Sequence, residues 1–233
     1  MLRAVDLLRA RAGAAAGRLL DLALPATCAG CAKDGEPICA ACAPALHARE
    51  RLEPGIPLCL PSDVPAPLLQ LEWCAPFSGT VRRALHALKY AGELRLTDPL
   101  AGAIAARWRR AGAGGDFVVN VPVHAGRAAE RGYDQAELLG RAVARQLHLP
   151  FVPALVRSRA TTAQFKLDRV HRGANVAGAF AIRPGTSARA VPGRWAILID
   201  DVVTTGATLS ACASALLDAG AIGVSAVTVA RER

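Results

Sequence analysis

The fold of this chain is decided by residues 195–208, which read WAILIDDVVTTGAT. The run from Trp195 to Ile199 is continuously apolar, as expected for a strand that is covered on both faces of a sheet. It leads directly into acids, hydroxyls and small residues at 200–208, which open a helix predicted at 206–219. This order of strand, turn and helix is the unit of a parallel α/β sheet, in which ligands bind at the carboxyl ends of the strands.

The alternation of strands and helices continues around this unit. Further strands are predicted at 116–123 and 223–230, and helices at 80–90, 96–110 and 135–148. The pattern predicts a doubly wound, mainly parallel α/β domain over residues 77–233.

Two segments precede this domain. Residues 1–45 combine an amphipathic helix with a cysteine motif, and residues 46–76 are rich in proline and predict an irregular connector. Charges interrupt the helix at 1–24, which excludes a signal-peptide core, and no apolar run reaches the ~20 residues of a membrane-spanning helix. We expect a cytoplasmic protein whose first helix docks; a membrane-surface or transit role is the alternative.

The chain carries 28 Lys and Arg against 19 Asp and Glu, a formal net charge of +9. A basic balance favours anionic partners such as phosphorylated metabolites, nucleic acid or acidic lipid. Nearly all of the charge is Arg, and heavy use of Ala and Arg also fits a GC-rich coding bias. The charge alone therefore does not indicate DNA binding.

Four of the seven cysteines form one motif, Cys28-x2-Cys31-x7-Cys39-x2-Cys42. Two knuckles at this spacing can place four thiolates around one tetrahedral Zn²⁺, and four protein ligands make such a zinc structural. Two disulfides are the alternative and need an oxidising compartment. His47 could replace a cysteine, although a surface histidine is the plainer interpretation. The remaining cysteines are expected to be small buried residues: Cys59, Cys74 and Cys212.

The turn before the helix at 206–219 has the chemistry of a phosphate site. Helix N-termini present unpaired N–H groups and the positive end of the helix dipole. Thr204, Thr205 and Thr208 add hydroxyl donors, and Gly206 lets the backbone come close. The turn lacks the GK[ST] ending of a Walker loop and the GxGxxG pattern of a dinucleotide site.

Two adjacent acids, Asp200 and Asp201, precede this turn. They would repel a bare phosphate, but they suit a ligand that presents hydroxyls and Mg²⁺ beside its phosphate. A ribose 5-phosphate is such a ligand. An acidic N-cap cluster on an ordinary helix is the alternative.

The segment ILIDDVVTTGAT, residues 197–208, resembles the phosphoribosyl-pyrophosphate (PRPP) motif of type I phosphoribosyltransferases. Several motifs earlier in the chain occur in the order typical of the ComF family. Members of this family are phosphoribosyltransferase-like proteins associated with competence for DNA uptake. The motifs are the cysteine knuckle, LKY at 88–90, VPVH at 121–124, RGYDQ at 131–135, Gln164 and RGANVAGAF at 172–180. The resemblance covers the chain from about residue 20 onward. It departs at Asp134, where the family usually has Asn, and at Cys59, which stands alone where a second cysteine pair sometimes occurs.

The resemblance implies displacement of pyrophosphate from C1 of PRPP by a base or amine nitrogen, with Mg²⁺ as cofactor and Zn²⁺ as structural metal. Asp200 and Asp201 would be the catalytic residues, orienting the ribose near the metal. Residues 157–175 would form a mobile lid, with a nucleic-acid strip as the alternative. PRPP would be bound by two loops: Thr204, Thr205, Gly206, Ala207 and Thr208 in one, and His124, Gly126, Arg127 and Arg131 in the other.

Two other functions remain open at this point. The chain could be a non-catalytic PRPP sensor or a single-stranded-DNA-binding module, with DNA or DNA-uptake proteins as partners. Alternatively, the zinc unit and the N-terminal helix could dock a partner protein.

Overall fold

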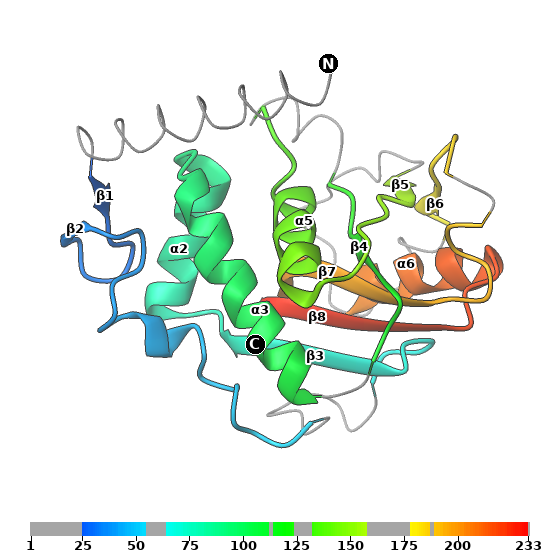
Figure 1. Cartoon of the computed structure of the whole chain (residues 1–233), viewed down its shortest axis with the longest axis horizontal. Helices are drawn as coiled ribbons and strands as arrows, with labels where there is room; N and C mark the ends of the chain where they lie inside the picture. The colour runs from blue at the N-terminus through cyan, green and yellow to red at the C-terminus, as the bar shows by residue number, and fades with distance from the viewer. Residues whose placement is uncertain are drawn as a thin grey trace, which may run out of the picture.

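The computed structural model describes residues 25–54, 64–111, 114–123, 132–157, 178–186 and 189–232. Its centre is a parallel four-stranded sheet in the order β3-β8-β7-β4 (Figure 1). The strands are β3 (Gln70–Pro76), β4 (Phe117–Asn120), β7 (Trp195–Val203) and β8 (Gly223–Arg231). The prediction of a mainly parallel sheet is confirmed.

Helices cover both faces of this sheet. Ile197 and Ile199 of β7 pack into the core shared with α2 (Gly79–Tyr90), α3 (Thr97–Ala111) and α5 (Gln135–Leu147). Ala196 and Leu198 point the other way, into the core shared with α6 (Ala207–Asp218). This alternation explains why 195–199 is apolar throughout, and it confirms the doubly wound arrangement.

The two short antiparallel strand pairs lie at opposite ends of the molecule (Figure 1). A short antiparallel pair, β1 (Ala26–Thr27) and β2 (Asp34–Gly35), belongs to the cysteine unit and precedes the 3-10 turn η1 (Ala43–Ala45). A second antiparallel pair, β5 (Leu155–Arg157) and β6 (Phe180–Ile182), packs on α6. The turn η2 (Leu94–Leu96) joins α2 to α3.

The chain leaves β4 and β7 in opposite directions. After β4, α5 leads to Phe151, which pairs with Val118 on the outer side of β4. After β7, α6 leads to β8 on the other side. Connections that diverge from two adjacent strands leave a crevice at their carboxyl ends, the usual ligand site of open α/β sheets.

Three predicted boundaries are wrong, the first of which is the end of the strand expected over 116–123, since β4 ends at Asn120. The strand expected to end at residue 199 continues as β7 to Val203, because Asp200 pairs with Thr228 and Val203 with Arg231 of β8. The connector expected to be irregular over 46–76 ends in β3, a buried strand of the main sheet. The domain boundary expected at residue 77 therefore falls just after a strand of the domain.

β3 buries a charged residue, Glu72, whose side chain is fully buried. This is possible because its carboxylate has hydrogen-bond partners. Arg107 of α3 donates to Glu72 Oε2 from Nε at 2.9 Å and from Nη2 at 2.5 Å. The same guanidinium donates to the carbonyl oxygens of Arg49, Leu52 and Glu53, at 2.7, 2.6 and 3.1 Å. One arginine thus ties residues 49–53 to the edge of the sheet.

The other predicted helices agree with α2, α3, α5 and α6 to within one residue at most ends. Cys74 and Cys212 are buried in the core, as expected, whereas Cys59 and the helix predicted at 1–24 lie outside the described residues. Within the described ranges, no helix has both the length and the apolar character that crossing a membrane requires.

Candidate functional site

Asp200 and Asp201 lie at the carboxyl end of β7, inside the strand. Asp201 is buried, with 6% of its surface exposed, and Asp200 is half-buried. The backbone N–H of Asp201 donates to Asp200 Oδ1 at 2.8 Å. On the α2 side of the sheet, Asp201 Oδ2 lies 2.5 Å from Nζ of Lys89. The two acids therefore have different surroundings: Asp201 pairs with a lysine, and Asp200 faces the turn that follows β7.

The turn after β7 forms a small concave pocket at the start of α6. The pocket is lined by Asp200, by Val202 and Val203, and by the run from Thr204 to Leu209. Gly206 is the N-cap of α6 with φ +82°, and Thr205 Oγ1 accepts weakly from Ala207 N–H at 3.4 Å. The first N–H groups of a helix have no partner within it, so this pocket suits an anion.

A larger cavity of about 180 Å³ opens beside this pocket, between the carboxyl ends of β4 and β7. It shares Asp200 and Thr208 with the pocket at the turn. The rest of its lining comes from α2, the segment just after β4, α5, β5 and β7: Lys89, Tyr90, Val121, Pro122, Val123, Gln135, Arg157 and Asp201. The predicted crevice therefore exists, and both acids line it.

The acid pair has unusual electrostatics. Burial raises the pKa of Asp200 well above its ordinary value, and the negative charge of Asp201 raises it further. The ammonium of Lys89 opposes this shift. When all three are ionised, the two carboxylates and the lysine carry a net negative charge. This charge suits a ligand with hydroxyl donors or a divalent cation.

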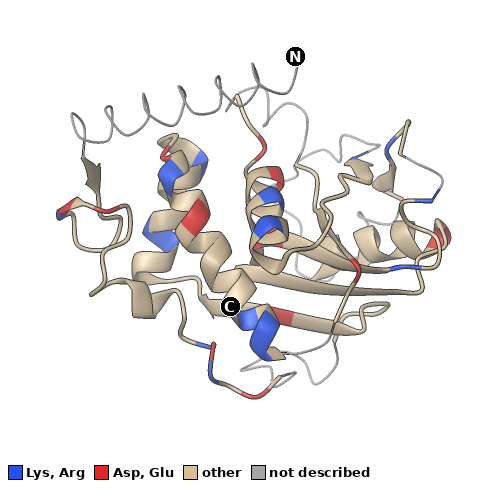
Figure 2. Cartoon of the chain, in the orientation of Figure 1, with Lys and Arg blue, Asp and Glu red and all other residues tan. Residues whose placement is uncertain are grey.

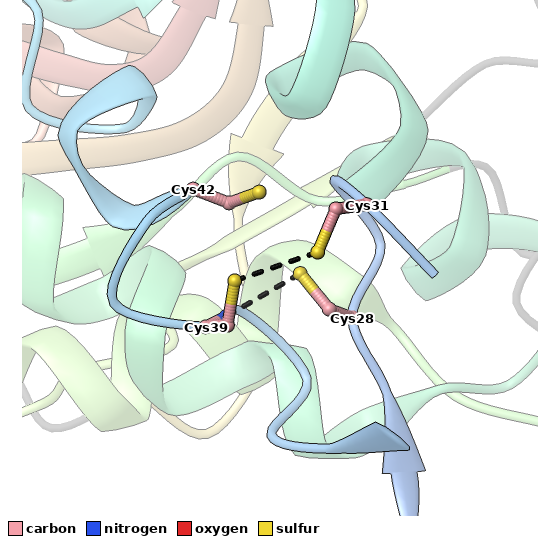
Figure 3. A group of neighbouring side chains, drawn as sticks. All are labelled: Cys28, Cys31, Cys39 and Cys42. Atoms are coloured by element: carbon pink, nitrogen blue, oxygen red, sulfur yellow. Dashed lines mark hydrogen bonds between the residues drawn. The ribbon is translucent and has the colours of Figure 1, made fainter. Parts of the chain in front are cut away.

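The four cysteines of the N-terminal motif converge (Figure 3). Their Sγ atoms all lie within 4.8 Å of one another, and Cys31 and Cys39 Sγ are 3.5 Å apart. A tetrahedron with Zn–S bonds of about 2.3 Å has S–S edges of about 3.8 Å, so the cluster fits zinc. Burial raises the pKa of Cys28, but backbone N–H bonds from Cys39, Cys31 and Gly30 lower it to about 6, which favours the thiolate. His47 instead pairs with Glu50, 2.6 Å from Nδ1 to Oε2.

The cysteine unit is attached to α2. Arg83 donates to the carbonyl oxygens of Ala29 and Gly30, at 2.8 and 2.6 Å. A Cβ at Gly30 would lie 2.4 Å from Cys42 Sγ, so only glycine fits against the cysteine cluster. The helix that begins beside the cysteines thus carries Lys89 in its last turn, beside Asp201.

Comparison with known proteins identifies the relatives of the chain. It is 31% identical to the DNA utilization protein YhgH of Escherichia coli K12 over 166 residues, which are 69% of this chain and 71% of that protein. It is 35% identical to competence protein F of Haemophilus influenzae over 96 residues, 41% of each chain. The chain belongs to the ComF family.

No protein-family model matches this ComF chain. Solved structures similar to it include an adenine phosphoribosyltransferase from Trypanosoma brucei, with 15% identity, a TM-score of 0.38 and coverage of 63% of this chain and 68% of that one. Another is the glutamine PRPP amidotransferase from B. subtilis, with 19% identity, a TM-score of 0.38 and coverage of 56% and 25%. These likenesses are weak, so the fold assignment rests on the sheet and on family membership.

Asp134, where ComF proteins usually have Asn, is the N-cap of α5. Its Oδ1 accepts from the N–H groups of Ala136 and Glu137, at 2.9 and 3.0 Å. Its Oδ2 accepts from Val123 N–H at 3.4 Å, at the carboxyl end of β4. Burial raises the pKa of Asp134. An Asn could make the helix cap, but its amide nitrogen could not also accept from Val123, so the departure from the family pattern is used structurally.

The structure brings some of the predicted site residues together. Asp200 and the predicted turn residues line one pocket, and Asp201 lies in the adjoining cavity. The second predicted loop begins where β4 leads out of the sheet at Val123, but His124, Gly126, Arg127 and Arg131 lie outside the described residues. So do Gln164 and most of the predicted lid at 157–175.

Four polar residues of the cavity were missing from the predicted site residues: Lys89, Tyr90, Gln135 and Arg157, the last of which was expected only as the first residue of the lid. The LKY and RGYDQ motifs contain three of them, so their presence among the family motifs was the available signal. Tyr133 of the second motif donates its hydroxyl hydrogen to the carbonyl oxygen of Leu88 in the first. This contact joins the two motifs, whose neighbouring residues Lys89, Tyr90 and Gln135 line the cavity.

Proposed function

We propose that this ComF protein binds PRPP with Mg²⁺ and transfers its phosphoribosyl group to an acceptor, releasing pyrophosphate. One observation carries the proposal: the acid pair, the hydroxyl-rich start of α6 and the end of β4 line connected pockets at the switch point of the sheet. Family membership supports it as well. Fold alone does not imply turnover, so the evidence must come from the site.

Each part of the site suits one part of PRPP. The 5-phosphate would lie on the N–H groups and hydroxyls of Thr204–Thr208, where the helix dipole favours an anion. Asp200 and Asp201 would accept from the ribose hydroxyls and hold Mg²⁺, for which carboxylate oxygens are suitable ligands. Mg²⁺ would neutralise the departing pyrophosphate. The loop with His124, Gly126, Arg127 and Arg131 would bind that pyrophosphate.

In the reaction, the acceptor nucleophile forms a bond to C1 while the bond from C1 to the pyrophosphate oxygen breaks, and pyrophosphate leaves with the electron pair. The proton of the acceptor passes to a base. The chain contributes chiefly position and charge stabilisation, because the transition state develops positive charge on the ribose. The carboxylates beside the ribose have the sign that this charge requires.

Structural zinc on Cys28, Cys31, Cys39 and Cys42 is part of the same proposal. The sulfur geometry supports it, and four protein ligands give this metal a structural role. The attachment of the unit to α2 through Arg83 places it one helix away from the acids.

A second candidate function is DNA handling without turnover, as a PRPP sensor or a single-stranded-DNA-binding module. The names of the relatives, a DNA utilization protein and a competence protein, favour it. The net charge of +9 agrees, although basic residues are spread over α5 and the end of α3 among acidic ones (Figure 2). Binding to DNA would weaken steeply with salt, whereas PRPP binding would depend on Mg²⁺ and on the acids.

The decisive experiment is calorimetric titration with PRPP, with and without Mg²⁺. The wild type should bind saturably only with Mg²⁺, and the double variant Asp200→Asn/Asp201→Asn should lose at least about 100-fold in affinity, as expected for two charged contacts. Asp218→Asn is the matched control, because Asp218 is exposed at the far end of α6. Pyrophosphate release on adding candidate acceptors then tests turnover. A folded, zinc-loaded wild type that ignores PRPP would refute the proposal.

A further inference from the structure

Lys89 stands at the junction of the acid pair and the cavity. Its Nζ lies 2.5 Å from Asp201 Oδ2, and the two side chains are only 19% and 9% exposed. It lines the same cavity as Thr208, which belongs to the turn at the start of α6. An ammonium in this position is within reach of both an acid and any anion that the cavity holds.

The backbone at Lys89 is held in place, whereas its side chain is long. Leu88 is fully buried, and its carbonyl oxygen accepts from the hydroxyl of Tyr133. At the other end of α2, Arg83 ties the helix to the cysteine unit. A lysine on a fixed backbone can still move its ammonium by rotating its four-carbon stem.

Lys89 and a divalent cation would compete for the same oxygen. Asp200, Asp201 and Lys89 together carry one net negative charge when all are ionised, so the lysine offsets much of the attraction for a cation. A cation bound at Asp201 Oδ2 would also lie within a few ångströms of the ammonium, where two positive charges repel strongly. This repulsion between the cation and the ammonium is relieved if Lys89 leaves Asp201.

We propose that Lys89 exchanges partners on ligand binding: its ammonium holds Asp201 in the ligand-free protein and moves to phosphate oxygens of the ligand when a divalent cation takes Asp201. This inference rests on the proposed PRPP site. It makes Lys89 a ligand-binding residue and gives the acid pair a built-in counter-ion. The exchange gives Asp201 a positive partner in each state, which a buried carboxylate requires.

The test compares two binding equilibria in Lys89→Met, measured in mildly alkaline buffer so that the carboxylates stay ionised. Mn²⁺ alone, followed by electron paramagnetic resonance, should bind the variant severalfold more tightly than the wild type, because the competing ammonium is gone. PRPP with saturating Mg²⁺ should bind it about 10- to 100-fold more weakly, the loss expected for one charge-assisted contact. Lys89→Arg should recover part of the PRPP affinity.

The opposite signs of the two changes separate exchange from a purely structural role. If Lys89 only positioned Asp201, its loss would weaken Mn²⁺ and PRPP binding together. Lys33→Met is the matched control, because Lys33 is exposed in the cysteine unit and should leave both affinities unchanged.

A measurement on the wild type keeps the proposal testable even if Lys89→Met does not fold. The chain has only Lys33, Lys89 and Lys166, so lysine labelled with ¹³C at Cε gives three NMR signals, of which Lys33→Met assigns one. Lys89 is identified as the signal that moves in Asp201→Asn. Addition of PRPP with Mg²⁺ should shift the Lys89 signal and leave that of Lys33 in place.

The outcomes separate this inference from the proposed function. PRPP binding that is unchanged in Lys89→Met, or a Lys89 signal that stays in place while PRPP binds, overturns the exchange and leaves the PRPP site standing. A wild type that does not bind PRPP overturns both.

Discussion

Replacement of Gly206 by alanine tests the turn that opens α6. Gly206 has φ +82°, and a Cβ there would lie 2.5 Å from Cγ and 3.2 Å from Cβ of Pro65. The left-handed conformation costs an L-residue about 1–2 kcal/mol. Overlap of a methyl group with the proline ring adds about 1–3 kcal/mol. The free energy of unfolding should therefore fall by about 2–5 kcal/mol.

Gly193→Ala isolates the conformational part of this loss. Gly193 has φ +70°, and nothing lies within 4 Å of the Cβ that would be added. It should lose only about 1–2 kcal/mol. Urea denaturation followed by circular dichroism measures both variants, and the difference between them reports the contact with Pro65.

Two further readouts complete the test. Pro65→Ala removes the atom at 2.5 Å, so the double variant Gly206→Ala/Pro65→Ala should be more stable than the sum of the two single changes predicts. PRPP affinity should drop in Gly206→Ala and not in Gly193→Ala. Equal loss of stability in Gly206→Ala and Gly193→Ala would refute the packing of Pro65 on this turn.

Three other predictions concern the buried charges and the metal. Glu72→Gln should lower the free energy of unfolding by about 3–5 kcal/mol, because it leaves the charge of the buried Arg107 uncompensated. Glu137→Gln, the control, breaks only an exposed pair with Arg141 and should cost about 0.5 kcal/mol or less. Urea denaturation measures both variants, and similar losses would contradict the role of Glu72. Burial and the charge of Asp201 raise the pKa of Asp200, so the stability that its proton provides is present in acid and is lost as pH rises through that raised pKa. A plot of Tm against pH should lose this pH-dependent contribution in Asp200→Asn. A profile that is the same in the variant and the wild type would contradict the raised pKa. A chelator should release about one zinc per chain and lower Tm. In elemental analysis, Cys39→Ser should lose the metal, whereas the control Cys212→Ser, which alters a cysteine of the core, should keep it. Zinc retained by Cys39→Ser would exclude the four-cysteine site.

Local patterns were enough to predict most of the fold. The apolar run at 195–199 and the helix at 206–219 follow from side-chain periodicity, since a strand covered on both faces needs no polar positions. The cysteine spacing predicted a cluster whose sulfur atoms do converge. Asp200 and the threonine-rich turn were recognised because strand, turn and helix are neighbours in sequence.

The errors arose where a local signal was overruled by a distant partner. Glu72 interrupts the apolar pattern of β3, and it is buried because Arg107 supplies five donated hydrogen bonds to it and to the nearby carbonyls. The strand was expected to end at residue 199, before Asp200 and Asp201, yet pairing with β8 extends the ladder past both acids to Val203.

The amino-acid pattern therefore established the α/β elements, the cysteine cluster and the acid-turn motif, all of which depend on neighbouring residues. Folding alone decided which charges meet. Lys89 pairs with Asp201, and Tyr133 contacts Leu88, because α2 crosses the carboxyl ends of the strands. No periodicity encodes such pairs, since they depend on how helices pack over the sheet and on the need of each buried charge for a partner.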